Sequence, residues 1–188
     1  SKQLERSFKK KKMKIMTGSA VESVDLSGEK CSVSVKTPSG NQTVNVDVVL
    51  SAVGITPNIE DIGLEKAGVK TGKGKVLVNE FYETSVPGIY AIGDIVPGPA
   101  LAHVASAEGI LCVEKIAGMD VRPLDYGNIA ACTYTNPEIA SVGLTEAAAK
   151  EAGREIKVGK FPFTASGKAT ASGSRDGFIK LIFDASYG

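Results

Sequence analysis

Residues 83–109 read ETSVPGIYAIGDIVPGPALAHVASAEG, and this stretch decides the fold class. It predicts a strand over residues 88–92 that ends in Gly93-Asp94, followed by a helix over residues 100–117. Ligands of open α/β sheets bind beyond the carboxyl ends of the strands, which is where Asp94 falls. Gly93 has no side chain and lets a ligand approach closely. The stretch therefore predicts a ligand site in an α/β protein.

The chemistry of this predicted site suits a nucleotide with a polyol chain. The Asp94 carboxylate can accept hydrogen bonds from sugar or polyol hydroxyls. The helix that begins behind Pro99 offers free N–H groups and a positive dipole end to an anion or a polarised carbonyl. A polyol acceptor beside a helix N-terminus describes a flavin nucleotide site. The alternative is an aspartate that caps its own loop, and the residues alone leave both interpretations open.

Upstream of this stretch the sequence predicts a helix and then strands. Residues 1–12 form a short helix whose lysines suit its C-terminal end, and they indicate a solvated helix end rather than a nucleic-acid patch because no aromatic residues lie between them. Residues 14–45 alternate polar and apolar between glycine turns, which predicts an antiparallel meander. Residues 46–54, VDVVLSAVG, form an apolar run typical of a strand buried on both faces. Another strand is predicted over residues 75–78.

On the downstream side, the predicted helix has a face of small residues that lets it approach a neighbouring backbone: Ala102, Ala105, Gly109 and Cys112. Residues 129–146 predict strand, turn and strand, and Thr145 is expected to cap a short helix that ends before Gly153. Residues 157–188 predict two strands joined across an Asp176-Gly177 turn. We expect their apolar residues to form an association surface of Phe161, Phe163, Phe178, Leu181 and Phe183.

Composition excludes several classes of function. The chain has 188 residues, of which 43% are hydrophobic and 23% charged, as in soluble α/β proteins. Its net charge of +1 creates no field that favours nucleic acid or membrane partners. Its apolar runs are shorter than a bilayer span, and its first residues do not fit a secretory signal. We expect a cytoplasmic protein.

The cysteines and the lone histidine indicate neither a metal site nor a local redox pair. Cys31, Cys112 and Cys132 show no C-x-x-C or similar spacing, and an odd number of scattered cysteines suits a reducing compartment and buried thiols. His103 is the only histidine, so a metal site would depend on carboxylates, and no acidic cluster offers one.

The stretch from residue 83 to 109 resembles the second flavin-binding motif of the dihydrolipoamide dehydrogenases, which are FAD-dependent disulfide oxidoreductases. The resemblance implies that Asp94, after Gly93, holds the ribityl chain of FAD. It also implies that the start of the helix contacts the isoalloxazine ring, largely through backbone groups, at Ala100, Leu101, Ala102 and His103. His103 is thus expected to be a flavin-side position and not a catalytic base.

The resemblance extends to the whole chain and implies a second cofactor, NAD. Residues 46–58 resemble the strand that closes the family's NAD domain, whose glycine, here Gly54, lies on the nicotinamide side. Val21, in TGSAVESV, matches a position that touches the NAD adenosine. Residues 134–146 resemble the opening of the dimerisation domain.

The predicted fold class is α/β, with partial nucleotide-binding (FAD/NAD) domain segments followed by part of an α+β dimerisation domain. Residues 1–58 are expected to be the C-terminal part of the NAD-binding domain. Residues 59–126 are expected to be the returning segment of the FAD-binding domain, and residues 127–188 the N-terminal half of the dimerisation domain. The sequence lacks the G-x-G-x-x-G fingerprints, a close cysteine pair and the family's acid–base histidine. We therefore expect an internal fragment that contains no catalytic residue and is inactive by itself.

The whole enzyme of this family reoxidises dihydrolipoamide with NAD, as a homodimer that works with the other subunits of 2-oxo acid dehydrogenase complexes. The resemblance implies these partners for the parent of this chain, and LAHVASAEG favours lipoamide over related substrates. Two alternatives remain: a related disulfide reductase of the glutathione or mercuric type, and a non-catalytic dimerisation module.

Overall fold

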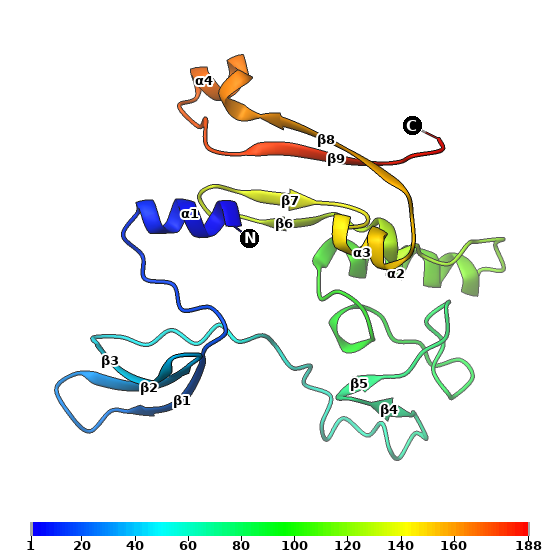
Figure 1. Ribbon diagram of the computed structural model, residues 1–188. Helices are drawn as coiled ribbons and strands as arrows, with labels where there is room; N and C mark the ends of the chain where they lie inside the picture. The colour runs from blue at the N-terminus through cyan, green and yellow to red at the C-terminus, as the bar shows by residue number, and fades with distance from the viewer. Residues whose placement is uncertain (1, 188) are drawn as a thin grey trace. The chain divides into compact units, whose positions relative to one another are not determined.

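A computed structural model describes residues 2–187 as two compact units (Figure 1). The first unit comprises Ser1–Val53, Tyr134–Ile139 and Arg154–Gly188, and the second comprises Gly54–Thr133 and Ala140–Gly153. The first unit is thus assembled from segments far apart in the sequence.

The meander predicted for residues 14–45 is confirmed in the first unit. Its three strands form an antiparallel sheet in the order β1-β2-β3, with β1 at Ala20–Asp25, β2 at Cys31–Thr37 and β3 at Gly40–Val46. Val33 and Val35 of the central strand are buried, and the residues between and after them are not. The alternation of apolar residues in the sequence therefore marks the covered face of the sheet.

The predicted N-terminal helix is also confirmed, as α1 (Lys2–Lys10). Leu4 and Phe8 are half-buried on one side, and Lys9 and Lys10 are exposed at its C-terminal end. Ser7 is buried, and its hydroxyl donates to Asp176 Oδ2 at 2.6 Å. This bond connects α1 to the far end of the sequence within the same unit.

The strand predicted over residues 46–54 is wrong. Beyond Val46 this segment has no strand structure, and Val48, Leu50 and Val53 are 79%, 89% and 94% exposed. An apolar run becomes a buried strand only where neighbouring strands pair with it and elements cover both faces. Within the described part of the chain, no strand pairs with residues 47–54.

The strands predicted over residues 75–78 and 88–92 are much shorter than expected. The first is reduced to β5 (Lys75–Val76), which pairs with β4 (Thr71–Gly72). The second makes one isolated bridge, Glu83 to Tyr90. Val76 and Ala91 of these segments nevertheless belong to the core of the second unit, together with Ile59, Val69 and Val96.

The predicted helix of the second unit is α2 (Ala102–Ile116), and Gly118 follows it in the left-handed conformation with φ +78°. Its small-residue face lies close to a neighbouring backbone, as predicted. A methyl group on Gly109 would lie 3.2 Å from Ile92 Cδ1, and one on Gly93 would lie 3.4 Å from Ala105 Cβ. Larger residues at these positions would separate the helix from the chain segment before it.

The C-terminal third follows the predicted order with one additional helix. It contains β6 (Ala131–Thr133), β7 (Ile139–Ser141), α3 (Glu146–Glu151), β8 (Ile156–Pro162), the 3₁₀ helix η3 (Phe163–Ala165), α4 (Gly167–Ala171) and β9 (Phe178–Asp184). The Thr145 hydroxyl accepts from Ala148 N–H at 3.1 Å, which confirms the predicted cap. The predicted tight turn at Asp176-Gly177 is wrong, because η3 and α4 occupy the connection between the last two strands.

The pairing of β8 with β9 decides which apolar residues share a face. The strands are antiparallel, with Phe161 opposite Ile179 and Pro162 opposite Phe178. Since side chains alternate along a strand, one face carries Phe161, Ile179, Leu181 and Phe183, all between 40% and 54% exposed. Phe178 points to the other face, so the association surface expected from sequence is corrected there. Phe163 lies outside the strands, in η3.

Along residues 2–187, none of the helices has the length and apolar character that a bilayer crossing requires.

Candidate functional site

The turn at Gly93-Asp94 places an exposed carboxylate directly after a glycine in the left-handed conformation. Gly93 opens the 3₁₀ helix η1 (Gly93–Ile95) with φ +77°, a conformation that disfavours any residue with a side chain. The Asp94 side chain is exposed, and no hydrogen bond or ion pair joins its carboxylate to another residue within 2–187. Asp94 therefore does not cap its own loop. Its carboxylate is available to hydroxyl groups of a ligand.

The N-terminus of α2 follows this turn and is open. Leu101 precedes the helix without a side-chain cap, and it accepts the backbone N–H groups of Val104 and Ala105. The N–H groups of Ala102 and His103 donate to no acceptor within the described part of the chain. Unpaired donors at a helix N-terminus attract anions and polarised carbonyls. The two features expected of a flavin site thus lie in one unit, eight residues apart.

His103 is held by the backbone. Its Nε2 lies 3.0 Å from the carbonyl oxygen of Ala130, to which this nitrogen donates. No carboxylate of residues 2–187 is paired with the ring. A histidine that works as a general base needs a free nitrogen aimed at a substrate and commonly a carboxylate behind the other. The structure shows instead an exposed ring whose Nε2 is bonded to a backbone carbonyl and which has no carboxylate partner among the described residues.

Glu108 lies behind the Gly93-Asp94 turn and was not found by the sequence reasoning. Its side chain is 1% exposed. Gly93 N–H donates to Oε2 with an N···O distance of 2.6 Å, and the Tyr126 hydroxyl donates to Oε1 at 2.6 Å. Tyr82 Oη is 3.2 Å from Tyr126 Oη and donates to it, because the Tyr126 proton is already directed at Glu108. The carboxylate therefore connects α2 with the turn and with two tyrosines.

A sequence signal for Glu108 existed in the spacing of the helix. Ala105 and Cys112, on the predicted small-residue face, lie three residues before and four residues after it. Residues at these spacings share one helix face. A glutamate on a helix face that is predicted to contact backbone needs buried hydrogen-bond donors for its carboxylate. This requirement identifies Glu108 as a residue with a structural or functional role.

Burial and this hydrogen-bond chain change the acidity of the neighbouring groups. Desolvation by burial raises the pKa of Tyr126, and its hydrogen bond to Glu108 raises it further. Although 39% of the Tyr126 surface is exposed, its hydroxyl is fixed between Glu108 and Tyr82. The pKa of Tyr82 is raised mainly by burial. Both phenols therefore remain protonated well above neutral pH.

The two positions expected to contact NAD, Val21 and Gly54, belong to different units of the structure. Val21 lies in β1 of the first unit, opposite Val35, with its side chain 61% exposed. Gly54 begins the second unit at φ +118°, and no described atom beyond its neighbours comes within 4 Å of a methyl group placed on it. Gly54 therefore has the open surroundings that a ligand contact needs, and Val21 has an accessible side chain.

The cysteines are free thiols in different surroundings. Cys112 is buried, and desolvation raises its pKa. Cys31 is half-buried, but Cys132 is exposed, which corrects the expectation that all three are buried. Cys132 lies in β6, whose two-stranded sheet leaves both its own faces open.

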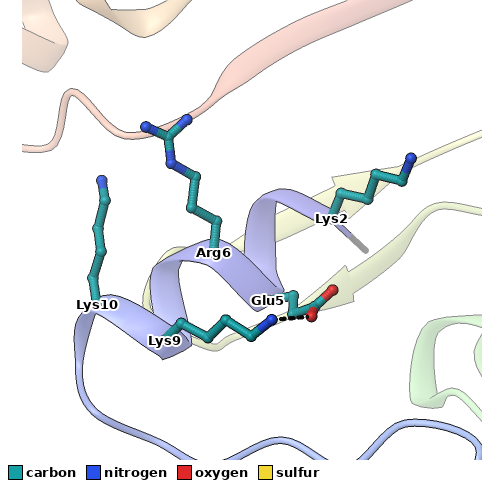
Figure 2. A pocket seen from close by; sticks show the side chains of 5 residues that line it. All are labelled: Lys2, Glu5, Arg6, Lys9 and Lys10. Atoms are coloured by element: carbon teal, nitrogen blue, oxygen red, sulfur yellow. Dashed lines mark hydrogen bonds and ion pairs between the residues drawn. The ribbon is translucent and has the colours of Figure 1, made fainter.

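Two further kinds of site receive no support from the part of the chain that is described. A hollow on α1 is lined by charged, mostly exposed side chains (Figure 2): Lys2, Glu5, Arg6, Lys9 and Lys10. Lys9 Nζ pairs there with Glu5 Oε1 at 2.6 Å, as on many solvated helices. Over residues 2–187, no three His, Cys, Asp or Glu side chains are grouped to hold a metal ion.

Two family models match the chain. Residues 1–109 match "Pyridine nucleotide-disulphide oxidoreductase", and residues 129–188 match the dimerisation domain of the same name. The junction between the two matches includes η2 (Tyr126–Asn128), which contains the tyrosine bound to Glu108.

Curated relatives resemble nearly all of the chain. The dihydrolipoyl dehydrogenase of Rhizobium etli is 49% identical over 95% of the chain. The mitochondrial dihydrolipoyl dehydrogenase of Pisum sativum is 45% identical over 96%. The chain spans 38% and 36% of the lengths of these relatives.

Solved structures show the same fold. LpdA of Mycobacterium tuberculosis has a TM-score of 0.88 and 30% identity, with 98% of this chain and 40% of that chain covered. The HOCl-induced flavoprotein disulfide reductase RclA of Escherichia coli has a TM-score of 0.88 at 22% identity, over 98% of this chain and 42% of that one, and shows the fold alone.

The raised pKa values of Tyr82 and Tyr126 predict a loss of stability in alkali. Above the ordinary tyrosine pKa of about 10, the unfolded chain releases phenolic protons that the folded chain keeps. The free energy of unfolding should therefore be unaffected by these groups below about pH 10 and should fall as the pH rises beyond it. Urea denaturation at a series of pH values measures this slope.

Tyr126→Phe is the matched variant, because it removes one of the two groups and keeps the ring. It should flatten the alkaline slope. An unchanged slope in Tyr126→Phe would contradict the assignment of the raised pKa to this hydroxyl.

Proposed function

The chain belongs to the pyridine nucleotide-disulphide oxidoreductase family, and from this premise we propose that it is part of an FAD-dependent dihydrolipoyl dehydrogenase. That enzyme oxidises dihydrolipoamide and passes the electrons through FAD to NAD. The observation that carries the proposal is the unpartnered Asp94 carboxylate next to the open N-terminus of α2. The identity of 49% to the Rhizobium etli relative favours lipoamide as the substrate.

The residues of the second unit fit a flavin. Asp94 accepts a hydroxyl of the ribityl chain, and Gly93 presents no side chain to the ligand and adopts a φ of +77° that residues with side chains rarely adopt. Ala100, Leu101, Ala102 and His103 face the ring system through the start of α2, whose free N–H groups and dipole favour a negatively charged or polarised edge. The FAD supplies the two-electron chemistry, as cofactors of this kind do.

NAD contacts and domain limits are part of the same proposal. Gly54 lies on the nicotinamide side and Val21 at the adenosine. Residues 1–58 belong to the NAD-binding domain, residues 59–126 to the FAD-binding domain and residues 127–188 to the dimerisation domain. The match of residues 129–188 to a dimerisation model supports the last limit.

The 188 residues contain no complete catalytic set. A dithiol relay needs two sulfurs close enough to bond, and Cys31, Cys112 and Cys132 are all free. Nε2 of His103 is bonded to the Ala130 carbonyl, and no carboxylate of residues 2–187 is paired with the ring. The role of this segment is to hold the cofactors, while the redox cysteines and the acid–base histidine come from other residues of the enzyme.

We propose a homodimer that associates with the other subunits of 2-oxo acid dehydrogenase complexes. The dimerisation match and the exposed apolar face of β8 and β9 support the homodimer. A reducing location such as the cytoplasm suits the free thiols. The Pisum sativum relative is mitochondrial, so the compartment depends on the source organism.

Substrate assays of the natural-length protein test the proposed function. NAD-linked oxidation of dihydrolipoamide is expected, without comparable reduction of glutathione disulfide or mercuric ion. A preference for glutathione disulfide or mercuric ion would show that the protein is a related reductase instead. A protein that binds FAD but has no activity would favour the non-catalytic dimerisation module.

Asp94→Ala tests the flavin contact in the same protein. The variant should bind FAD about 10- to 100-fold more weakly, because a charge-assisted hydrogen bond of about 1.5–3 kcal/mol is lost. FAD released on dialysis measures this effect. Asp120→Ala is the matched control, since Asp120 is exposed and outside the site. Equal FAD retention in the two variants contradicts the role of Asp94.

Phe183→Lys tests the proposed association face. A charge placed among Phe161, Ile179 and Leu181 should shift the protein from dimer to monomer, since burying an unpaired charge is costly. Sedimentation velocity at low micromolar concentration measures the shift, and circular dichroism checks that the variant is folded. Leu26→Lys is the control, because Leu26 is 70% exposed outside this sheet. A folded Phe183→Lys protein that remains dimeric rules this face out.

A further inference from the structure

Glu108 is a buried residue of α2 whose carboxylate is hydrogen-bonded to the Gly93-Asp94 turn. It is 1% exposed, and no Lys, Arg or His of residues 2–187 pairs with it. Its two oxygens have different partners, Gly93 N–H and the Tyr126 hydroxyl, both at 2.6 Å. A buried carboxylate without a cation depends on such donors to compensate for lost hydration.

The bond to Gly93 fixes the orientation of the turn. Gly93 has φ +77°, so the chain leaves its N–H group in a direction that a residue with a side chain would rarely take. Glu108 Oε2 holds that N–H against α2, and the next residue, Asp94, then projects to solvent. The direction of the Asp94 carboxylate is thus set by a contact made one residue before it.

The second oxygen keeps the carboxylate itself in place. Tyr126 donates to Oε1, and its ring packs against the same loop, where a methyl group on Gly98 would lie 3.1 Å from Tyr126 Cε1. Lys75 Nζ donates to the carbonyl oxygen of Val96 at 2.9 Å and supports the middle of the loop. The loop is therefore held at Gly93, Val96 and Gly98.

We propose that Glu108 is a positioning residue for the flavin site: through Gly93 N–H it aims Asp94 at the ribityl chain, with Tyr126 as its second anchor. The inference rests on the proposed function for the identity of the ligand. The Glu108–Gly93 contact is observed independently of the proposed function, so the contact and the flavin can be tested separately.

Hydrogen exchange at the Gly93 amide tests the contact in the natural-length protein without FAD. Glu108→Gln keeps the shape but loses the charge of the acceptor, and Gly93 should exchange about ten-fold faster. Tyr126→Phe should give a smaller increase in the same direction. Glu114→Gln is the matched control on the same helix and should leave Gly93 unchanged. Unchanged exchange in folded Glu108→Gln would overturn the proposal, whatever the protein binds.

FAD affinity tests whether the contact acts through Asp94. Glu108→Gln should weaken FAD binding about ten-fold, and the Asp94→Ala/Glu108→Gln double variant should bind FAD no more weakly than Asp94→Ala alone. A residue with a merely structural role would add its full effect in the double variant, and that additive result would overturn the proposal. Equal FAD binding by wild type and Asp94→Ala would instead refute the proposed flavin contact.

Discussion

The candidate site depends on the hydrogen bond between Gly93 N–H and the buried Glu108 carboxylate. A carboxylate inside a protein is stable only where donors replace its water, and here a backbone amide and a phenol do so. The contact requires α2 to approach the turn closely, which Gly93, Ala105 and Gly109 permit by their small size. Once the contact is made, Asp94 projects outward beside the open start of the helix. The position of α2, the conformation of the turn and the direction of the Asp94 carboxylate are thus linked through one side chain.

The parts of the fold that the sequence predicted correctly depend on contacts close along the chain. Val33 and Val35 alternate with polar residues, and their strand pairs with neighbours joined by short turns. Thr145 caps α3 through a bond to a residue three positions later. The strand prediction that is wrong concerns contacts that are distant in sequence. The apolar run that includes Val48 and Leu50 has a strand composition, but a strand forms only with partner strands, and a local pattern does not contain them.

The candidate site shows the same limit. The residues of the turn and the helix start were predicted because strand, glycine, aspartate and helix follow one another directly. Glu108 was missed because its donors lie 15 and 18 residues away, at Gly93 and Tyr126, and only the fold brings them together. Its place on a helix face of small residues was the available signal. A charged residue on a face that must contact backbone indicates a buried partner as strongly as a hydrophobic stripe indicates a core.

A crystal structure of the natural-length protein with FAD bound tests the central claim most directly. The account predicts that the Asp94 carboxylate accepts a ribityl hydroxyl, with the ring system at the N-terminus of α2 and Glu108 still bound to Gly93 N–H. A ribityl chain bound elsewhere, or a Glu108 side chain turned away from Gly93 while FAD is in place, would contradict it.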